Sequence, residues 1–232
     1  MDGAGKTTIR AVIFDFDETM IDLEPQHAIA DAILCRSMGN DYMELPEEYR
    51  KGSGRRVIDD IREMRDRFGW TRPIEELEGA RREAFDEACR SSALSLLPGV
   101  ERSVRALLER GLTLAVTSSA VRGSIEEILR RFELLDAFAL IVDGSEVERP
   151  KPDPEPYLLT ARKLGVSPAE CLVFEDSTVG VASAKSAGMK CIAVRNPMAK
   201  TAQDLSEADE VLDSFEQFDP ASVGGRPERR SS

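Results

Sequence analysis

The chain has 232 residues, 41% of them hydrophobic and 32% charged, and a formal net charge of −12. This composition predicts a folded core of ordinary size, either one large domain or a core with a smaller insert, and excludes global disorder. The negative charge argues against a nucleic-acid partner, and no apolar run has the length of a membrane span or a signal peptide. Four scattered cysteines without CxxC spacing predict free, mostly buried thiols in a protein of the reducing cytoplasm.

The first predicted element is a buried strand, Ala11–Asp15, which leads into two aspartates one residue apart. Asp15 and Asp17 would reach one spot at the sheet edge where open α/β folds bind ligands, and Thr19 follows closely. Two carboxylates so close repel each other unless a cation or a shared proton lies between them. A hard divalent cation such as Mg²⁺ is the natural companion, whereas a strand that runs into an Asp-rich turn is the alternative.

The next stretch, Ile21–Leu96, is almost wholly helical in pattern. Apolar residues at helical spacing predict helices at Glu24–Ser37, Arg56–Phe68 and Glu75–Cys89, separated by glycine-bearing breaks and Pro73. Because this stretch directly follows the first strand, we interpret it as an inserted helical cap that covers the two aspartates.

From Leu97 onward, short apolar runs alternate with amphipathic segments. Strands separated by helices of this length predict right-handed βαβ units and a parallel, doubly wound α/β sheet. The polar, aperiodic tail at 219–232 and residues 1–8 are predicted to be flexible. The predicted strands are Leu112–Val116, Ala139–Val142, Cys171–Phe174 and Lys190–Val194, and the predicted helices are Val100–Arg110, Ser124–Phe132, Glu155–Leu164 and Val179–Ala187.

Three later segments also carry polar side chains beside predicted strands. Thr117 and Ser118 follow a strand, where backbone amides at the start of the next helix could hold an anion. Lys151 lies between two prolines, whose rigidity suits an ammonium group that must reach a phosphate. Glu175 and Asp176 end another strand and could complete a cation site. Taken singly, a helix cap explains the first segment and a solvated lysine the second.

Together the four segments resemble the haloacid dehalogenase superfamily of phosphohydrolases. The family pattern is Asp-x-Asp-x-Thr, then Thr or Ser, then Lys, then an acidic pair. The helical insert resembles the cap of the β-phosphoglucomutase and phosphoglycolate phosphatase branch. The resemblance implies a Rossmann-type core at residues 9–21 and 96–218 and a cap at residues 22–95. In this chain the pattern reads Asp15-Phe16-Asp17-Glu18-Thr19, Thr117, Lys151 and Glu175-Asp176.

The resemblance assigns catalytic roles to residues of the first three segments. Asp15 is the implied nucleophile that forms an aspartyl-phosphate, and Asp17 is the implied general acid and then base. Thr117, Lys151 and the backbone amides around Ser118 would hold the phosphoryl oxygens. A phosphatase or mutase is favoured over a dehalogenase, because dehalogenases of the family lack the second aspartate.

The resemblance also implies a Mg²⁺ site. Its ligands would be the side chains of Asp15 and Asp176 and the backbone carbonyl of Asp17, with Glu175 in or near the coordination shell. One cation and one lysine would then face three or four acids, so the loss of either should be severe.

Substrate recognition is assigned to the cap. His27 stands where many members of the branch carry a histidine, and Arg55 resembles a cap arginine that meets the distal phosphate in the mutases. The chain departs from the family pattern at Glu18, which is usually glycine, and at Ala120, where mutases commonly have lysine. The serine that accompanies the cap arginine in mutases also has no match here.

The departures favour a phosphatase over a β-phosphoglucomutase-type isomerase, which is the alternative. We expect a small phosphorylated metabolite of the sugar phosphate type as substrate, and a monomeric enzyme without a membrane partner. A non-catalytic binding protein on the same fold is the third hypothesis.

Three other signals are discounted. Met1–Thr8 looks like the end of a P-loop, but no strand precedes it and a strand, rather than a helix, follows it. Trp70 and Phe68 are interpreted as packing residues of the cap. The basic runs Arg62–Arg67 and Arg81–Arg82 are interpreted as solvated helix faces with acidic partners.

Overall fold

The computed structural model describes residues 8–47, 57–196 and 203–224. These residues divide into two compact units. The core unit comprises residues 8–21, 96–196 and 203–224, and the cap unit comprises residues 22–47 and 57–95. Arg55 and most of the segment Met1–Thr8 lie outside the described residues.

The core unit is built on a six-stranded parallel sheet with strand order β3-β2-β1-β4-β5-β6. It confirms the doubly wound α/β fold predicted from the alternating strands and helices. The last strand was not predicted, because three residues with charged neighbours give no strand pattern. The strands are β1 (Ala11–Phe14), β2 (Thr113–Thr117), β3 (Leu140–Val142), β4 (Cys171–Glu175), β5 (Lys190–Val194) and β6 (Glu210–Leu212).

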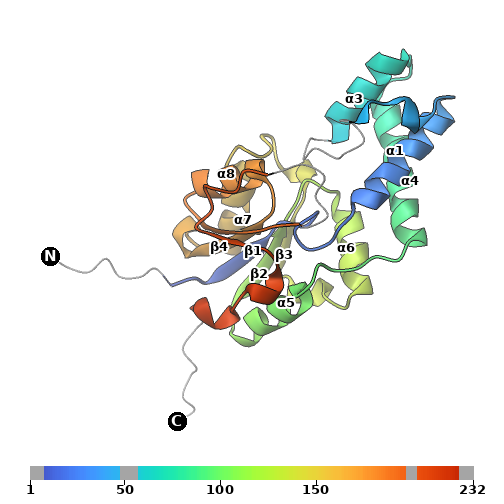
Figure 1. Cartoon of the computed structure of the whole chain (residues 1–232). Coiled ribbons are helices and arrows are strands. Elements are labelled where there is room, and N and C mark those ends of the chain that lie inside the picture. Colours follow the sequence, from blue (N-terminus) through green and yellow to red (C-terminus); the bar gives the residue numbers. More distant parts are fainter. Residues whose placement is uncertain (1–7, 48–56, 197–202, 225–232) are drawn as a thin grey trace, which may run out of the picture. The chain divides into compact units, whose positions relative to one another are not determined.

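Helices cover both faces of this sheet (Figure 1). Ile13 of β1 belongs to a buried cluster with Tyr157 of α7 and Val181 of α8. Phe14, the next residue along β1, has its ring centroid 5.1 Å from that of Phe174 on β4. Neighbouring residues of one strand therefore pack into different layers, as the pleat requires. The helices of this unit are α5 (Val100–Glu109), α6 (Arg122–Arg131), α7 (Glu155–Leu164) and α8 (Thr178–Ser186).

The direction of chain winding changes between β1 and β4. From β1 the chain proceeds through β2 to β3 on one side, and then crosses to β4, β5 and β6 on the other. The two neighbouring strands β1 and β4 thus flank the topological switch point, and their carboxyl ends share one edge of the sheet. Ligands of open α/β folds bind at this position.

The C-terminal segment is described as far as residue 224. A short 3₁₀ helix, Pro220–Ser222, is followed by Val223, which is buried. The Arg110 side chain donates to the Val223 carbonyl over 2.9 Å, and Arg102 donates to the carbonyl of Phe218 over 3.2 Å. Arginines of α5 thus contact residues 218–224, a segment that has no periodicity of its own.

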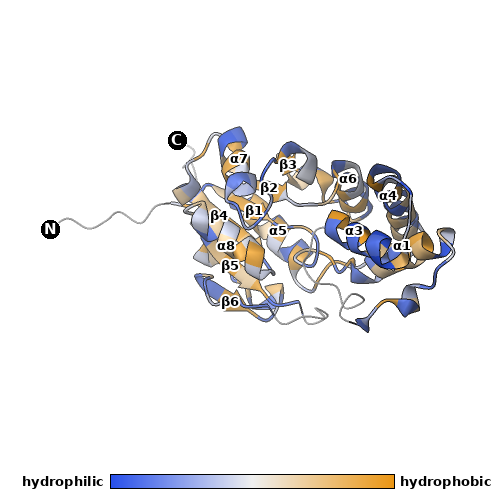
Figure 2. Ribbon diagram, turned by 90° about the horizontal axis from the view of Figure 1, so that it is seen from above, coloured by the Kyte–Doolittle hydropathy of each residue, from blue (hydrophilic) through white to orange (hydrophobic). Residues whose placement is uncertain are grey.

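The cap unit consists of three described α-helices, α1 (Glu24–Ser37), α3 (Val57–Phe68) and α4 (Ile74–Ser91), and a 3₁₀ turn at Tyr42–Glu44. Figure 2 shows hydrophilic and hydrophobic stretches on both α3 and α4, as expected for amphipathic helices. Trp70 is buried, stacks on Phe68 with centroids 5.5 Å apart, and donates its indole N–H to Asn40. These contacts agree with a packing role for the two rings.

Two further sequence-based expectations concern membranes and thiols. Among the described residues, none of the helices is both long and apolar enough to traverse a bilayer. The cysteines Cys35, Cys89, Cys171 and Cys191 are all free and buried, as predicted.

Candidate active site

Three carboxylates meet at the carboxyl ends of β1 and β4. Asp15 directly follows β1, Glu175 is the last residue of β4, and Asp176 comes next. One carboxylate oxygen from each lies within 4.8 Å of the others, and all three residues are buried. The register of β1 against β4 pairs Phe14 with Phe174, so the acids that follow reach the same point. The structure thus brings together two of the four segments on which the resemblance rests.

Lys151 adds the third segment to this cluster. Its Nζ donates to Asp15 Oδ1 and to Glu175 Oε1, each over 2.6 Å. The ammonium also lies 5.0 Å from the centre of the Tyr157 ring. Burial by itself disfavours a charged lysine, but the carboxylates of Asp15 and Glu175 outweigh it and raise the pKa of Lys151. Lys151 is therefore a fixed positive charge between two acids.

Protein groups bind both oxygens of the Glu175 carboxylate. Oε1 accepts from Lys151 and from the Tyr157 hydroxyl, and Oε2 accepts from the backbone N–H groups of Asp176 and Ser177 and from the Ser177 hydroxyl. Burial alone would raise the pKa of Glu175, but the charge of Lys151 and these hydrogen bonds lower it. A Cβ atom on Gly180 would overlap the carboxylate, so glycine at this position leaves the space that Glu175 fills.

The pKa values of the other two acids of the cluster, Asp15 and Asp176, are raised, whereas that of Glu175 is lowered. Burial raises the pKa of Asp15 to about 7, although the charge of Lys151 acts to lower it. Burial and the charges of Glu175 and Asp15 raise the pKa of Asp176 well above its ordinary value. The Thr19 hydroxyl donates to Asp176 Oδ1 over 2.9 Å. Two buried acids that favour protonation suit a divalent cation, which would replace the protons. The ligand atoms that this cluster offers are all carboxylate oxygens, which hard cations prefer.

Asp17 lies beside the cluster but its carboxylate is not among the three grouped oxygens. Its backbone forms an isolated bridge with Ile21, and its negative charge contributes to the raised pKa of Asp15. It is half-buried. The side chain is thus within electrostatic reach of Asp15.

The predicted phosphate-binding residues Thr117 and Ser118 lie at the end of β2, next to β1. Both are buried. The Thr117 hydroxyl lies 2.6 Å from that of Thr160 on α7, and the Ser118 hydroxyl accepts from the backbone N–H of Ala120 over 3.0 Å. Sequence reasoning found Thr117 but not Thr160, because the two residues are 43 positions apart.

Glu18 adopts a backbone conformation that favours glycine. Its φ angle is +64°, in the left-handed region, and its carboxylate accepts a hydrogen bond from the Asn196 side chain after β5. The related family pattern usually has glycine here, and the positive φ gives a physical reason for that choice. The Glu18–Asn196 contact was not predicted, because nothing in the sequence pairs these two loops.

His27, the predicted substrate residue of the cap, belongs to a polar cluster within the cap unit. Arg81 of α4 donates to Asp31 over 2.7 Å and contacts His27 Nδ1 over 3.1 Å. The imidazole stacks on Phe85 with centroids 4.5 Å apart. The interpretation of Arg81 as part of a solvated face is wrong, because Arg81 is buried where α4 packs against α1.

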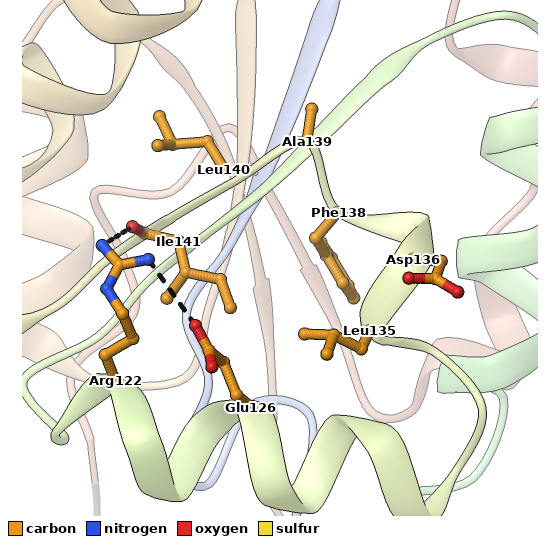
Figure 3. A pocket seen from close by; sticks show the side chains of 8 residues that line it. All are labelled: Arg122, Glu126, Leu135, Asp136, Phe138, Ala139, Leu140 and Ile141. Atoms are coloured by element: carbon orange, nitrogen blue, oxygen red, sulfur yellow. Dashed lines mark hydrogen bonds and ion pairs between the residues drawn. The ribbon is translucent and has the colours of Figure 1, made fainter.

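A cavity of about 460 Å³ lies elsewhere in the core unit (Figure 3). Arg122 donates to the carbonyl of Ile141 on β3 at one side of it, and β3 is an edge strand of the sheet. The guanidinium therefore occupies an edge carbonyl that would otherwise be open to pairing. None of the carboxylates described above lines this cavity, whose residues are Arg122, Glu126, Leu135, Asp136, Phe138, Ala139, Leu140 and Ile141.

Comparison with known proteins identifies the family. The chain is 32% identical over 213 residues to hexitol phosphatase B from Escherichia coli K12, covering 90% of this chain and 94% of that protein. It is 33% identical over 194 residues to a phosphorylated carbohydrates phosphatase from Thermotoga maritima, covering 79% and 84%. Among solved structures, a mutant of CbbY from Rhodobacter sphaeroides in complex with xylulose-1,5-bisphosphate has a TM-score of 0.79, with 26% identity, 94% of this chain and 100% of that chain covered.

The family model for haloacid dehalogenase-like hydrolases matches residues 12–194, which include the acidic cluster and Lys151. Membership and the buried acidic cluster together indicate a site for a divalent metal ion. The family predicted from the four sequence segments is confirmed: the chain belongs to the haloacid dehalogenase-like hydrolases.

Proposed function

We propose that this chain is a Mg²⁺-dependent phosphatase that hydrolyses a small phosphorylated metabolite of the sugar phosphate type. Residues 9–21 and 96–218 would form its catalytic core and residues 22–95 its cap. The observation that carries the proposal is the buried group of Asp15, Asp176 and Glu175 with Lys151 at the switch point of the sheet. A non-catalytic binding protein has no need of such a costly arrangement of buried charges.

In the proposed reaction, an Asp15 oxygen attacks phosphorus and the bond between phosphorus and the leaving oxygen breaks. Asp17 gives its proton to that oxygen, and an aspartyl-phosphate on Asp15 results. A water molecule then attacks the phosphorus of this intermediate and gives a proton to Asp17, which restores both aspartates and releases inorganic phosphate. The bond between Asp15 and phosphorus breaks in this second step, water is the only co-substrate, and no oxidant is required.

The remaining groups would bind and orient the phosphoryl group. Lys151, the Thr117 hydroxyl and the amides around Ser118 supply hydrogen-bond donors for its oxygens. Lys151 also keeps Asp15 in place through its 2.6 Å contact.

Mg²⁺ is the metal ion that we propose for the acidic cluster. The side chains of Asp15 and Asp176 and the backbone carbonyl of Asp17 would hold it, with Glu175 in or near the shell. Hard oxygen donors suit this ion, and when bound it lowers the repulsion between the carboxylates and a phosphate group.

The sugar phosphate class is supported by the relatives. Their names specify a hexitol phosphatase and a phosphatase of phosphorylated carbohydrates, and the similar crystal structure holds xylulose-1,5-bisphosphate. His27 and Arg55 of the cap are the residues that we propose for recognition of the leaving group. The four buried free thiols support a reducing, cytoplasmic location. For the oligomeric state we propose a monomer.

The test is phosphate release from a panel of sugar and polyol monophosphates, with Mg²⁺ and with chelator. We expect Mg²⁺-dependent release that Asp15→Asn abolishes and that Asp66→Asn, on the exposed surface of α3, leaves unchanged. Conversion of β-glucose 1-phosphate to glucose 6-phosphate with a bisphosphate primer, in place of release, would make the chain a mutase. Release that survives chelation or Asp15→Asn would contradict the proposed chemistry.

A further inference from the structure

Helix α7 presents two buried hydroxyl groups to the active-site residues. Tyr157 and Thr160 are three positions apart in the helix, so they lie on the same face. Both are fully buried. The Tyr157 hydroxyl bonds to Glu175, and the Thr160 hydroxyl bonds to Thr117. Each hydroxyl therefore contacts a residue at the carboxyl end of a different strand.

Tyr157 supports the lysine of the cluster on two sides. Its hydroxyl donates to Glu175 Oε1 over 2.7 Å, the same oxygen that accepts from Lys151. Its ring lies beside the Lys151 ammonium, 5.0 Å from Nζ to the centroid. The ring alone would suffice for packing, since Tyr157 is part of the apolar cluster between sheet and helices. The hydroxyl adds a hydrogen bond to a charged acceptor, which is among the stronger kinds.

The Thr160 hydroxyl has two hydrogen-bond partners, the Pro156 carbonyl and the Thr117 hydroxyl. The Thr160 hydroxyl oxygen lies 2.9 Å from the carbonyl oxygen of Pro156. Because a carbonyl oxygen can only accept, Thr160 donates its proton in this hydrogen bond. The proton in the 2.6 Å contact between Thr117 and Thr160 is then that of Thr117. To donate to a phosphoryl oxygen, Thr117 must turn its proton outward, and Thr160 can then donate to Thr117 instead of to Pro156. Thr160 can thus serve Thr117 as acceptor without ligand and as donor with ligand.

We propose that Tyr157 and Thr160 are positioning residues: Tyr157 orients Lys151 through Glu175, and Thr160 orients the Thr117 hydroxyl toward the phosphoryl group. This inference rests on the proposed phosphatase function. The two residues serve different groups, so their loss has different consequences. Lys151 contacts the nucleophile Asp15, and its displacement affects the chemical step, whereas Thr117 would contact the bound phosphoryl group.

The experiment compares the Mg²⁺-loaded wild type with Tyr157→Phe, Thr160→Val and Thr160→Ser. Steady-state kinetics on the best monophosphate give kcat and KM, and calorimetry gives the Kd of inorganic phosphate. Ser103→Ala is the matched control, because Ser103 is a fully buried hydroxyl in α5 of the same unit that has no hydrogen-bond partner among the described residues. Thermal unfolding establishes that each variant is folded.

We expect Tyr157→Phe to lower kcat about tenfold with KM within about twofold. Thr160→Val should raise KM and the Kd of phosphate about tenfold, with kcat within about threefold. Thr160→Ser should restore values within about twofold of the wild type, because it keeps the hydroxyl. Ser103→Ala should change none of these quantities.

Equal kinetic constants in the wild type and the two hydroxyl-deletion variants, or losses that the Ser103→Ala variant shares, would overturn the inference alone. Tighter phosphate binding in Thr160→Val would overturn the role given to Thr160. A wild type that neither hydrolyses monophosphates nor binds phosphate would overturn the proposed function and this inference with it.

Discussion

Replacing Asp15 by asparagine should stabilise the protein in the absence of a divalent cation, although it removes the proposed nucleophile. Burial raises the pKa of Asp15 to about 7 in the folded state, against its ordinary value of 3.8. Between about pH 4 and pH 7, the folded protein therefore keeps a proton at Asp15 that the unfolded chain has already released. Because the folded pKa is the higher one, stability falls as the pH rises from about 4 to about 7. Asparagine imitates the protonated acid and escapes this loss.

The magnitude follows from the difference between the two pKa values. A difference of about 3 units at about 1.4 kcal/mol per unit sets an upper value of about 4 kcal/mol at pH 8. The pKa of about 7 already includes the attraction of Lys151, so we expect a net gain of up to about 4 kcal/mol. Between pH 5.5 and pH 8 the advantage of Asp15→Asn should grow by about 2 kcal/mol, because folded Asp15 keeps its proton up to about pH 7 whereas the unfolded chain has already released it.

The assay is urea-induced unfolding of both proteins at pH 5.5 and pH 8 with chelator present. Asp143→Asn is the control of opposite sign: burial alone would raise the pKa of Asp143, but hydrogen bonds from Ser145 and Arg122 outweigh it and lower it. The stability contributed by Asp143 is present above its unfolded pKa and is lost as pH falls, so Asp143→Asn should destabilise at pH 8. Equal stability of Asp15→Asn and wild type at both pH values, or a loss at pH 8, would refute the reasoning.

Two further predictions concern backbone positions around the cluster. Gly180→Ala should destabilise the protein and lower its activity, because the added Cβ displaces the Glu175 carboxylate. Gly79→Ala is the control: Gly79 lies in a helix with open space around it, so alanine there should stabilise the protein by about 0.5–1 kcal/mol. Urea unfolding of both variants tests this contrast. The Glu18→Gly variant should be more stable than the Glu18→Ala variant by about 1 kcal/mol. Both variants lose the hydrogen bond to Asn196, but only alanine retains the strain of a positive φ. Equal unfolding midpoints for the two variants would contradict this.

Much of the core could be predicted from the sequence, because its elements carry strong local patterns. The predicted bounds of Lys190–Val194 and Glu155–Leu164 equal those of β5 and α7. The cap helix Glu24–Ser37 was also predicted with its observed bounds. In each case the apolar spacing continues to a glycine, a proline or a polar cluster that marks an end.

The acidic cluster could be predicted because the topology of a parallel sheet places its residues together. Once the strands are known to be parallel, residues that end β1 and β4 must share an edge, whatever their separation in sequence. The contacts of Arg81 with Asp31 and of Thr160 with Thr117 could not be predicted in this way. They depend on which face of a helix packs inward and at what depth, and a basic or hydroxyl residue gives no apolar signal of that orientation.

The pKa values of the three acids distinguish support from function within one cluster. Glu175 keeps a low pKa because protein donors bind both of its oxygens, so its charge is compensated without any ligand. Asp15 and Asp176 lie in the same buried space, but there burial outweighs the donors around them and raises both pKa values. Burial disfavours the negative charges of Asp15 and Asp176, and a bound cation would offset that penalty, whereas protein donors already compensate the charge of Glu175. Acids whose environments separate their pKa values so widely take different roles, and we infer that Glu175 fixes Lys151 while Asp15 and Asp176 are the primary cation ligands.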